Sequence, residues 1–435
     1  SFSAGWNVSR EPFWRDLEHI VNNFKIRGSW GELGNCNTTA FYPFYQTMPT
    51  GVENSGWLIN GKKPNTASAP GIVSAEMTWE TVRSWNIGFD FGLLNNRLTG
   101  SFDYFVRNTL DMIGPAPQLP ATLGATVPKV NNADMKAWGF EVEVSWRDRI
   151  KDFNYGVKFV LSDDQRKVTR YPNEELNRNQ WYAGRMDGLV WGYETVGIAK
   201  TDAEMEAHLA SLPNGGQSQL GSKWAAGDIM YKDLNGDGKI SSGDGTLNDL
   251  GDLKVVANTQ LRFKYGLTLD ASWKGFDFSA FFQGVGKRDV VVGGPYFWGA
   301  NGQGMWQAAA FKDHMDYFRP EDTESVFGPN VDAYYPRVIF GGGSSEGGKN
   351  TLTQSRYVQN GAYIRLKNLQ LGYTLPSTIT KKFAVNSLRV YVSGDNLWTG
   401  TKMRVFDPEV LGSTGDAGKA YPLARVWSVG LNVNF

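Results

Sequence analysis

Apolar and polar residues alternate with a period of two along many stretches of this chain. The last residues show this most clearly, because apolar side chains occupy every second position: Trp427, Val429, Leu431, Val433 and Phe435. Successive side chains of a β-strand point to opposite faces, so the pattern predicts a strand with one apolar and one polar face. The chain ends on an aromatic residue, and we expect this strand to be the closing and assembly strand of a membrane β-barrel.

The same alternation predicts eleven strands in total. They cover residues 1–9, 23–31, 83–93, 98–110, 138–147, 153–165, 261–273, 276–289, 362–375, 388–398 and 423–435. Most of these stretches are about ten residues long or more, whereas strands of globular proteins average about 5–6 residues. Asn95-Asn96 and Lys274-Gly275 are expected to form tight turns, since Asn and Gly tolerate positive φ.

The connections between these strands alternate between short and long. The short ones are 94–97, 147–152, 274–275 and 376–387, and the long ones are about 32–80, 111–137, 166–260, 290–361 and 399–422. Short periplasmic turns and long extracellular loops are typical of outer-membrane barrels. A β-sandwich would also alternate, but it accounts for neither the strand length nor this asymmetry. We therefore predict an all-β fold, a transmembrane antiparallel β-barrel with long extracellular loops.

Two features concern the start of the chain. It begins directly as a strand without a signal peptide, and eleven antiparallel strands cannot close a barrel with both ends on one side. We therefore expect further strands upstream, in a longer protein. Residues 10–22 carry apolar side chains at helical spacing, which predicts a short amphipathic helix at the periplasmic end.

Composition narrows the function classes. The 44 basic and 44 acidic residues balance, so nothing favours a nucleic-acid partner. High aromatic and Gly content with a negative mean hydropathy fits a barrel, whose strands are only half apolar. No apolar run approaches the ~18–20 residues of a membrane helix. Cys36 is the single cysteine, which excludes a disulfide scaffold within the chain and a Cys-based zinc site.

One metal-binding motif lies in the long connection 201–255, which we expect to be an extracellular loop. Residues 233–244 match a calcium loop of the form D-x-N-x-D-G-x-I-x-x-x-D. Side-chain oxygens at positions 1, 3, 5 and 12 and a backbone carbonyl at position 7 suit a hard cation. The predicted ligands of a structural Ca²⁺ are Asp233, Asn235, Asp237, Lys239 and Asp244. The alternative is an Asx-rich surface turn without metal.

Searches for catalytic chemistry find nothing convincing. His19, His208 and His314 have no metal-ligand spacing, and Glu141 and Glu143 read as a solvated lumen wall rather than a glycosidase pair. We therefore expect no enzymatic activity. Aromatic residues are frequent in 290–361, and such rings either stack on a ligand or pack the loops together. The candidate substrate contacts are Tyr296, Trp298 and Trp306.

Several segments resemble SusC/RagA-type TonB-dependent transporters. They are FKIRGSWGELGN (24–35), RLTGSFDY (97–104), GFEVE (139–143), YKDLNGDGKI (231–240), GFDFSAFFQG (275–284), YIRLKNLQLGY (363–373), LRVYVSGDNL (388–397), Asp407-Pro408-Glu409 and the last fifteen residues. The resemblance implies a 22-stranded outer-membrane barrel, of which 1–435 would be the C-terminal half. A plug and a TonB box, which such transporters carry, are not found in this sequence.

The resemblance also implies a function. Similar transporters import glycans or oligopeptides that are too large for porins, with a glycan favoured here. A SusD-like lipoprotein would cap the extracellular mouth, TonB would supply energy, and transporter–lid pairs could dimerise. The surrounding membrane lipid would contact the apolar strand faces. Two alternatives stay open, a secreted or surface carbohydrate-binding β-protein and a passive porin.

Overall fold

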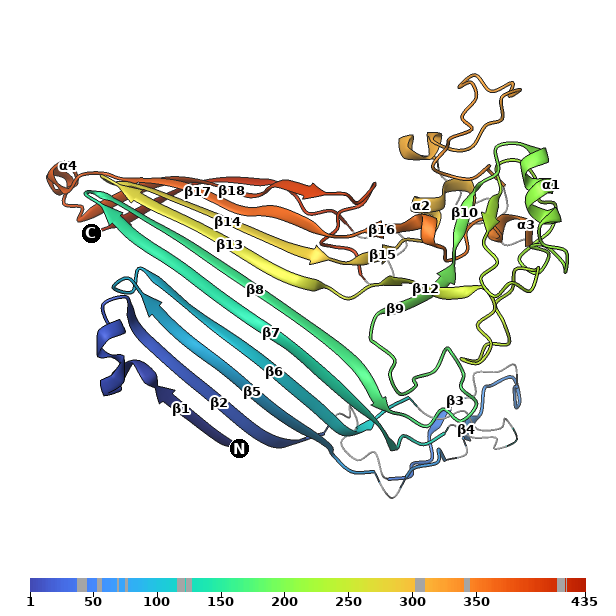
Figure 1. The fold of residues 1–435 in the computed structure, drawn as a ribbon, viewed down its shortest axis with the longest axis horizontal. Helices are drawn as coiled ribbons and strands as arrows, with labels where there is room; N and C mark the ends of the chain where they lie inside the picture. Colours follow the sequence, from blue (N-terminus) through green and yellow to red (C-terminus); the bar gives the residue numbers. More distant parts are fainter. Residues whose placement is uncertain are drawn as a thin grey trace.

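A computed structural model describes residues 1–36, 45–52, 57–68, 70–74, 77–115, 122, 127–301, 310–339, 345–412, 419 and 421–435. Their main element is one antiparallel sheet of eleven strands, curved into an open trough (Figure 1). Its strands follow chain order: β1 (Phe2–Asn7), β2 (Val21–Asn35), β5 (Glu80–Leu93), β6 (Leu98–Ile113), β7 (Asn131–Ile150), β8 (Phe153–Arg170), β13 (Arg262–Trp273), β14 (Phe276–Lys287), β17 (Tyr363–Thr374), β18 (Ser387–Thr401) and β19 (Val426–Asn434). The eleven predicted strands are confirmed.

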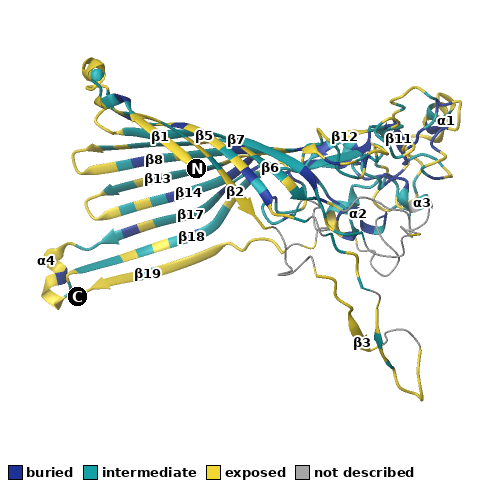
Figure 2. Ribbon diagram, turned by 90° about the horizontal axis from the view of Figure 1, so that it is seen from below, coloured by how far each residue is buried: buried dark blue, intermediate teal, exposed yellow. Residues whose placement is uncertain are grey.

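The two faces of this curved sheet differ in polarity, because the strand register pairs apolar residues with apolar residues. Leu431 pairs with Val390, Val390 with Tyr373, and Tyr373 with Phe276, so one apolar face crosses from strand to strand. Many of these side chains have no protein cover, as the exposed colouring of β19 in Figure 2 shows. On strands inside the sheet, Ile87 of β5 is 53% exposed and Leu371 of β17 is 56% exposed. An exposed apolar face of this extent suits contact with lipid.

The opposite face carries polar and charged side chains that pair across strands. Arg27 of β2 contacts Asp90 of β5 at 3.2 Å and also Asp103 of β6. Lys264 of β13 lies 2.8 Å from Asp164 of β8. The two faces of the sheet therefore separate apolar from polar surface, as the period-two pattern predicts.

Tight turns join the strands at one end of the sheet. Asn95, Asn96 and Lys274 all adopt positive φ, and Trp273 pairs directly with Phe276 across the Lys274-Gly275 turn. Two-residue turns of this kind match the twist of a hairpin. The turn between β17 and β18 is longer and holds α4 (Ser377–Thr380) and η8 (Lys381–Phe383).

The helix predicted over 10–22 is present only in part, because it is shorter than expected and is a 3₁₀ helix rather than an α-helix. The segment forms two short 3₁₀ turns, η1 (Val8–Arg10) and η2 (Pro12–Leu17), and Val21 already belongs to β2. With 6 residues, η2 is shorter than the ~12–15 that an isolated helix needs to be stable, so its stability must come from packing on the sheet. Trp14 stacks on Phe24 of the sheet, with 5.5 Å between ring centroids.

The long connections gather at the other end of the sheet (Figure 1). The described parts of these loops contain four small two-stranded sheets: β3 (Thr50–Val52) with β4 (Asn65–Ala67), β9 (Leu189–Tyr193) with β12 (Leu253–Asn258), β10 (Thr195–Ile198) with β11 (Ile229–Tyr231), and β15 (Asp289–Val291) with β16 (Val358–Asn360). Short helical segments complete this region: α1 (Asp202–Ala210), α2 (Pro295–Trp298), α3 (Ser345–Gly348), η4 (Gly299–Asn301), η6 (Lys312–Met315) and η7 (Ser355–Tyr357). Across the described ranges, every helix is too short or too polar to cross a membrane.

Candidate functional site

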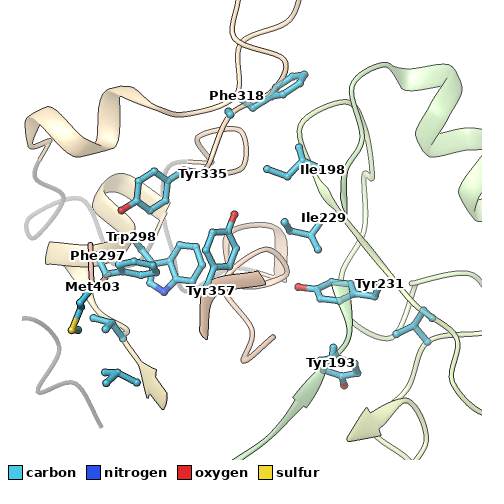
Figure 3. Close-up of a cluster of buried hydrophobic side chains, with 14 of the residues drawn as sticks. Tyr193, Ile198, Ile229, Tyr231, Phe297, Trp298, Phe318, Tyr335, Tyr357 and Met403 are labelled. Atoms are coloured by element: carbon cyan, nitrogen blue, oxygen red, sulfur yellow. The ribbon is translucent and has the colours of Figure 1, made fainter. Parts of the chain in front are cut away.

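Three of the long loops share one hydrophobic core, which we call the loop core. The β8–β13 loop contributes Ile229 and Tyr231, the β14–β17 loop contributes Phe297 and Tyr357, and the β18–β19 loop contributes Met403 (Figure 3). Tyr231 is fully buried, and burial raises its pKa well above the ordinary value for tyrosine, with smaller contributions from Tyr357, Tyr193 and Asp228. These loops therefore form a packed layer at the end of the sheet.

A buried ion pair joins two of these loops. Asp228 of the β8–β13 loop and Lys349 of the β14–β17 loop are both fully buried, with 3.0 Å between Nζ and Oδ2. Asp228 also accepts hydrogen bonds from Arg337 at 2.7 Å and from Asn350 at 2.8 Å. Lys349 Nζ further donates to the carbonyl of Ser222 at 2.7 Å. Nearly all polar atoms of the pair thus have partners, which buried charges require.

A cavity of about 1120 Å³ lies between the polar face of the sheet and the loop layer. Its walls come from β8, β13 and β14, from residues 187–190 and 259–261 of the β8–β13 loop, and from residues 408–412 of the β18–β19 loop. Pockets for drug-sized ligands are about 300–1,000 Å³. This cavity can therefore hold a ligand larger than a typical metabolite.

Charged side chains of both signs line the cavity. They are Asp164, Arg166, Arg185, Asp187, Lys264, Arg288 and Glu409. Some of them pair within the wall, since Arg166 lies 3.5 Å and Lys264 2.8 Å from Asp164. The lining can accept or donate hydrogen bonds along most of its surface, so it suits a polar ligand with many functional groups.

The predicted calcium ligands lie on a compact turn. Both carboxylate oxygens of Asp233 accept backbone hydrogen bonds, from Gly236 at 2.7 Å and from Gly238 at 2.9 Å. Burial opposes ionisation of Asp233, but its hydrogen bonds, with those from Gly238 and Gly236 foremost, together outweigh burial and lower its pKa. Asn235 and Asp237 accept from the N–H groups of Asp237 and Lys239. The loop thus adopts the turn that the motif predicts, with Gly236 and Gly238 at positive φ.

Position 12 of the motif has different surroundings. Asp244 accepts a hydrogen bond from Thr246 N at 2.7 Å. Asp252, which the motif does not include, crosses the loop and accepts from Leu234 N and Ser241 N at 2.7 Å each. Burial raises the pKa of Asp252, and the charges of Asp233 and Asp237 add to this. Within the described part of the chain, no three His, Cys, Asp or Glu side chains form a ready metal cage.

The three candidate aromatic contacts are placed differently. Trp298 is only 7% exposed and packs edge-on against Tyr357, with 4.6 Å between ring centroids. Tyr296 is 41% exposed and stacks on Phe311 at 5.6 Å. Trp306 lies outside the described residues. The burial of Trp298 favours loop packing, and among these residues Tyr296 offers the accessible ring.

The apolar row of the terminal strand continues the apolar face of the sheet, since Leu431 and Val429 pair with Val390 and Val392. Trp427, Val429 and Leu431 are each more than 60% exposed, and β19 pairs with β18 on one side. The strand order places β1 and β19 at the two ends of the sheet. The described sheet is therefore an open wall, which agrees with the strand count from sequence.

Sequence reasoning missed the residues that shape the cavity. Arg288 and Arg365 are 5% and 2% exposed and hold the β18–β19 loop in place. Their partners are distant along the chain, since Arg288 and Leu411 are 123 residues apart. A charged residue that breaks a regular alternation, as Arg365 does in YIRLKNLQLGY, was the available signal.

Known proteins are similar to this chain in sequence and in fold. Residues 1–272 match the family model described as TonB dependent receptor-like, beta-barrel. TonB-dependent receptor P3 of Formosa agariphila is 27% identical over 459 residues, covering 100% of this chain and 41% of the relative. TonB-dependent receptor SusC of Bacteroides thetaiotaomicron is 23% identical over 440 residues, covering 100% of this chain and 40% of the relative.

A solved structure shows the same fold. The RagAB peptide transporter superposes with a TM-score of 0.72 at 21% sequence identity, covering 100% of this chain and 43% of that chain. The chain thus spans about two fifths of the length of the curated relatives it matches. The family model covers more than half of the chain. The chain is thus similar over its whole length to SusC and to the RagAB transporter, and it belongs to the TonB-dependent receptor family, as a part of an outer-membrane β-barrel.

Proposed function

We propose that the full-length protein actively imports a large polar nutrient across the outer membrane, with this chain as barrel wall and outer loops. The observation that carries this proposal is the cavity of about 1120 Å³ between the polar face of the sheet and the loop layer. A ligand held there would sit inside the barrel and beneath the extracellular loops. TonB would supply the energy, and a SusD-like lipoprotein would cover the mouth.

The charged side chains of the cavity wall indicate the chemical class of the cargo. An oligosaccharide or an oligopeptide presents many hydrogen-bonding groups, which charged walls can recognise through Arg166, Lys264 and Glu409. Aromatic stacking on a sugar ring would fall to an exposed ring such as Tyr296, because Trp298 is buried in the loop core. The proposed cargo is therefore a polar oligomer, a glycan or a peptide.

Dependence on TonB distinguishes active import from passive diffusion. The native bacterium would be grown on single polysaccharides and on a protein hydrolysate, with and without the transporter gene. We expect one of these nutrients to require the transporter, and growth on it to stop when TonB is removed. A passive porin would keep supporting growth without TonB, and that result would contradict active import.

A secreted carbohydrate-binding protein, the alternative, would need a different structure around the sheet. Its sheet would need a second layer over the apolar face, yet Trp427, Val429 and Leu431 lie exposed on that face. The full-length protein should therefore require detergent for extraction and carry its lipoprotein partner with it. Recovery as a detergent-free soluble monomer would favour the secreted alternative.

We also propose that the loop 233–244 binds a structural Ca²⁺. Asp233, Asn235 and Asp237 would supply side-chain oxygens and Lys239 its carbonyl, as the motif predicts, with Asp244 as the predicted last ligand. The support is the turn that already orients both oxygens of Asp233 towards the Gly236 and Gly238 N–H groups. The ion would pin the β8–β13 loop, a stabilising role without catalysis.

Removal of calcium should therefore loosen this loop. Extracellular calcium modules bind with a Kd on the order of 10⁻⁴ M. Millimolar Ca²⁺ would then stabilise the loop by roughly 1.4 kcal/mol, about tenfold in its opening equilibrium. We expect chelation to speed proteolysis within 201–255 by about that factor, and D233N to abolish the calcium effect. D249N, outside the motif, is the matched control. Equal protease resistance with and without chelator would exclude the site.

A further inference from the structure

Part of the β18–β19 loop turns back into the trough and forms one wall of the cavity. We call residues 407–412 the latch. Pro408, Glu409, Leu411 and Gly412 all line the cavity, opposite the inner faces of β8 and β13. The latch thus supplies the part of the cavity wall that comes from the β18–β19 loop.

A β-bulge in β17 creates the site that holds the latch. Leu366 pairs with Phe282 and Asn368 with Phe281, so Lys367 is the extra residue. Without the bulge, strict alternation from Leu369 would place Arg365 on the apolar face. With it, Arg365 turns to the polar face and becomes 2% exposed. Bulges re-aim side chains in this way and often lie at functional sites.

Arg365 is the centre of a clamp on the latch. Its Nη2 donates to both carboxylate oxygens of Asp407, at 2.7 and 2.6 Å. Its Nη1 forms an ion pair with Glu409 at 2.9 Å, and Lys367 contacts the same carboxylate at 2.8 Å. Its Nε donates to Thr399 on the neighbouring strand at 2.8 Å. Two acidic side chains of the latch are therefore fixed to the barrel wall by one arginine.

Arg288 holds the rest of the latch through its backbone. It donates to the carbonyl of Pro408 at 3.0 Å, of Leu411 at 2.7 Å and of Gly412 at 2.8 Å. Leu411 also packs into the loop core, where it is 4% exposed. The latch is therefore held by contacts with the barrel wall and with the loop core together.

We propose that Arg365 is a positioning residue that controls access to the cavity through the latch. When Arg365 holds Asp407 and Glu409, the latch forms a cavity wall. When those ion pairs break, the latch leaves the wall and the cavity opens towards the extracellular side. This inference rests on the proposed function only in treating the cavity as the cargo chamber.

Cysteine accessibility on intact cells tests the latch without any cargo. In the full-length protein, C36S removes the exposed thiol that residues 1–435 contribute. L411C reports release of the latch, and S162C reports access to the cavity wall. Each reporter is combined with R365A, D407N or R389A and exposed to a membrane-impermeant maleimide. Arg389 serves as the control, because it pairs with Asp277 and Gln370 on the polar face instead of with the latch.

We expect R365A and D407N to speed labelling of both reporters by roughly tenfold or more, because loss of one partner leaves buried charges unpaired. R389A should label at the parent rate, and the exchange R365D/D407R should restore slow labelling. Heat-modifiable mobility in gels shows whether each variant has folded. If R365A does not fold, the labelling rate of D407N tests the proposal. Parent-rate labelling in folded R365A or D407N would overturn the proposal. The labelling assay contains no nutrient, so its result does not depend on whether the protein imports one.

Discussion

The variant D228N is expected to open the loop layer while leaving the barrel folded. Asp228 is fully buried and pairs with the equally buried Lys349. The substitution removes the charge that Lys349 faces, and Glu346 at 3.2 Å is the remaining acidic partner among its described contacts. Breaking a buried pair by removing one partner costs about 3–5 kcal/mol. Since Asp228 also binds Arg337 and Asn350, the loss should spread through both loops.

Hydrogen exchange on the detergent-solubilised full-length protein would measure this effect. We expect amides of β10, β11 and residues 345–360 to exchange 10²-fold faster or more in D228N, as the free-energy cost predicts. The control is D332N, because Asp332 pairs with Lys200 across the same two loops but both side chains are more than half exposed. An exposed pair contributes about 0–1 kcal/mol, so D332N should exchange nearly as the parent does. Equal effects of the two variants would contradict the role of the buried pair.

The second large effect is expected from arginine substitutions on opposite faces of β18. Val392 lies on the apolar face, where it pairs with Leu371 and Val429. Its neighbour Ser393 points to the polar face and pairs with Gln370 and Ser428. An arginine on the lipid face of a barrel costs roughly 2–4 kcal/mol near the midplane, whereas a lumen position can solvate the charge.

Folding of the full-length protein into liposomes from urea measures these costs. V392R should lower the free energy of unfolding by roughly 2–4 kcal/mol, and S393R by less than about 1 kcal/mol. The two variants add the same side chain to adjacent positions, so they differ mainly in the face they modify. A larger loss for S393R than for V392R would mean that the lipid-facing and lumen-facing assignments are reversed.

The sheet was predictable because its rule is local. Side chains alternate along each strand, so the face on which Trp273 and Phe276 lie can be predicted without knowing the neighbouring strand. The dipeptide Lys274-Gly275 likewise predicts the turn between them. The residues 10–22 show the limit of such reasoning. Their helical spacing correctly indicates a helix, but the helix is of the 3₁₀ type and covers only Pro12–Leu17, and β2 begins at Val21.

The loop layer was not predictable from local patterns. Asp228 and Asn350 lie 122 residues apart, and neither stretch signals that it meets the other. Trp298 illustrates the same difficulty, because a loop aromatic can stack on a ligand or on a neighbouring loop, and only the fold decides. The calcium-type loop could be recognised as a sequence motif. The hydrogen bonds that Asp252 accepts from Leu234 and Ser241 depend instead on the path of the chain after residue 244.

The cavity can be tested most directly by a structure of the full-length transporter with its lipoprotein partner, purified from cells grown on the nutrient that requires it. We expect cargo density in the space bounded by Arg166, Lys264 and the latch residue Glu409. Cargo bound only on the outer surface of the loops, with that space filled by solvent, would contradict it.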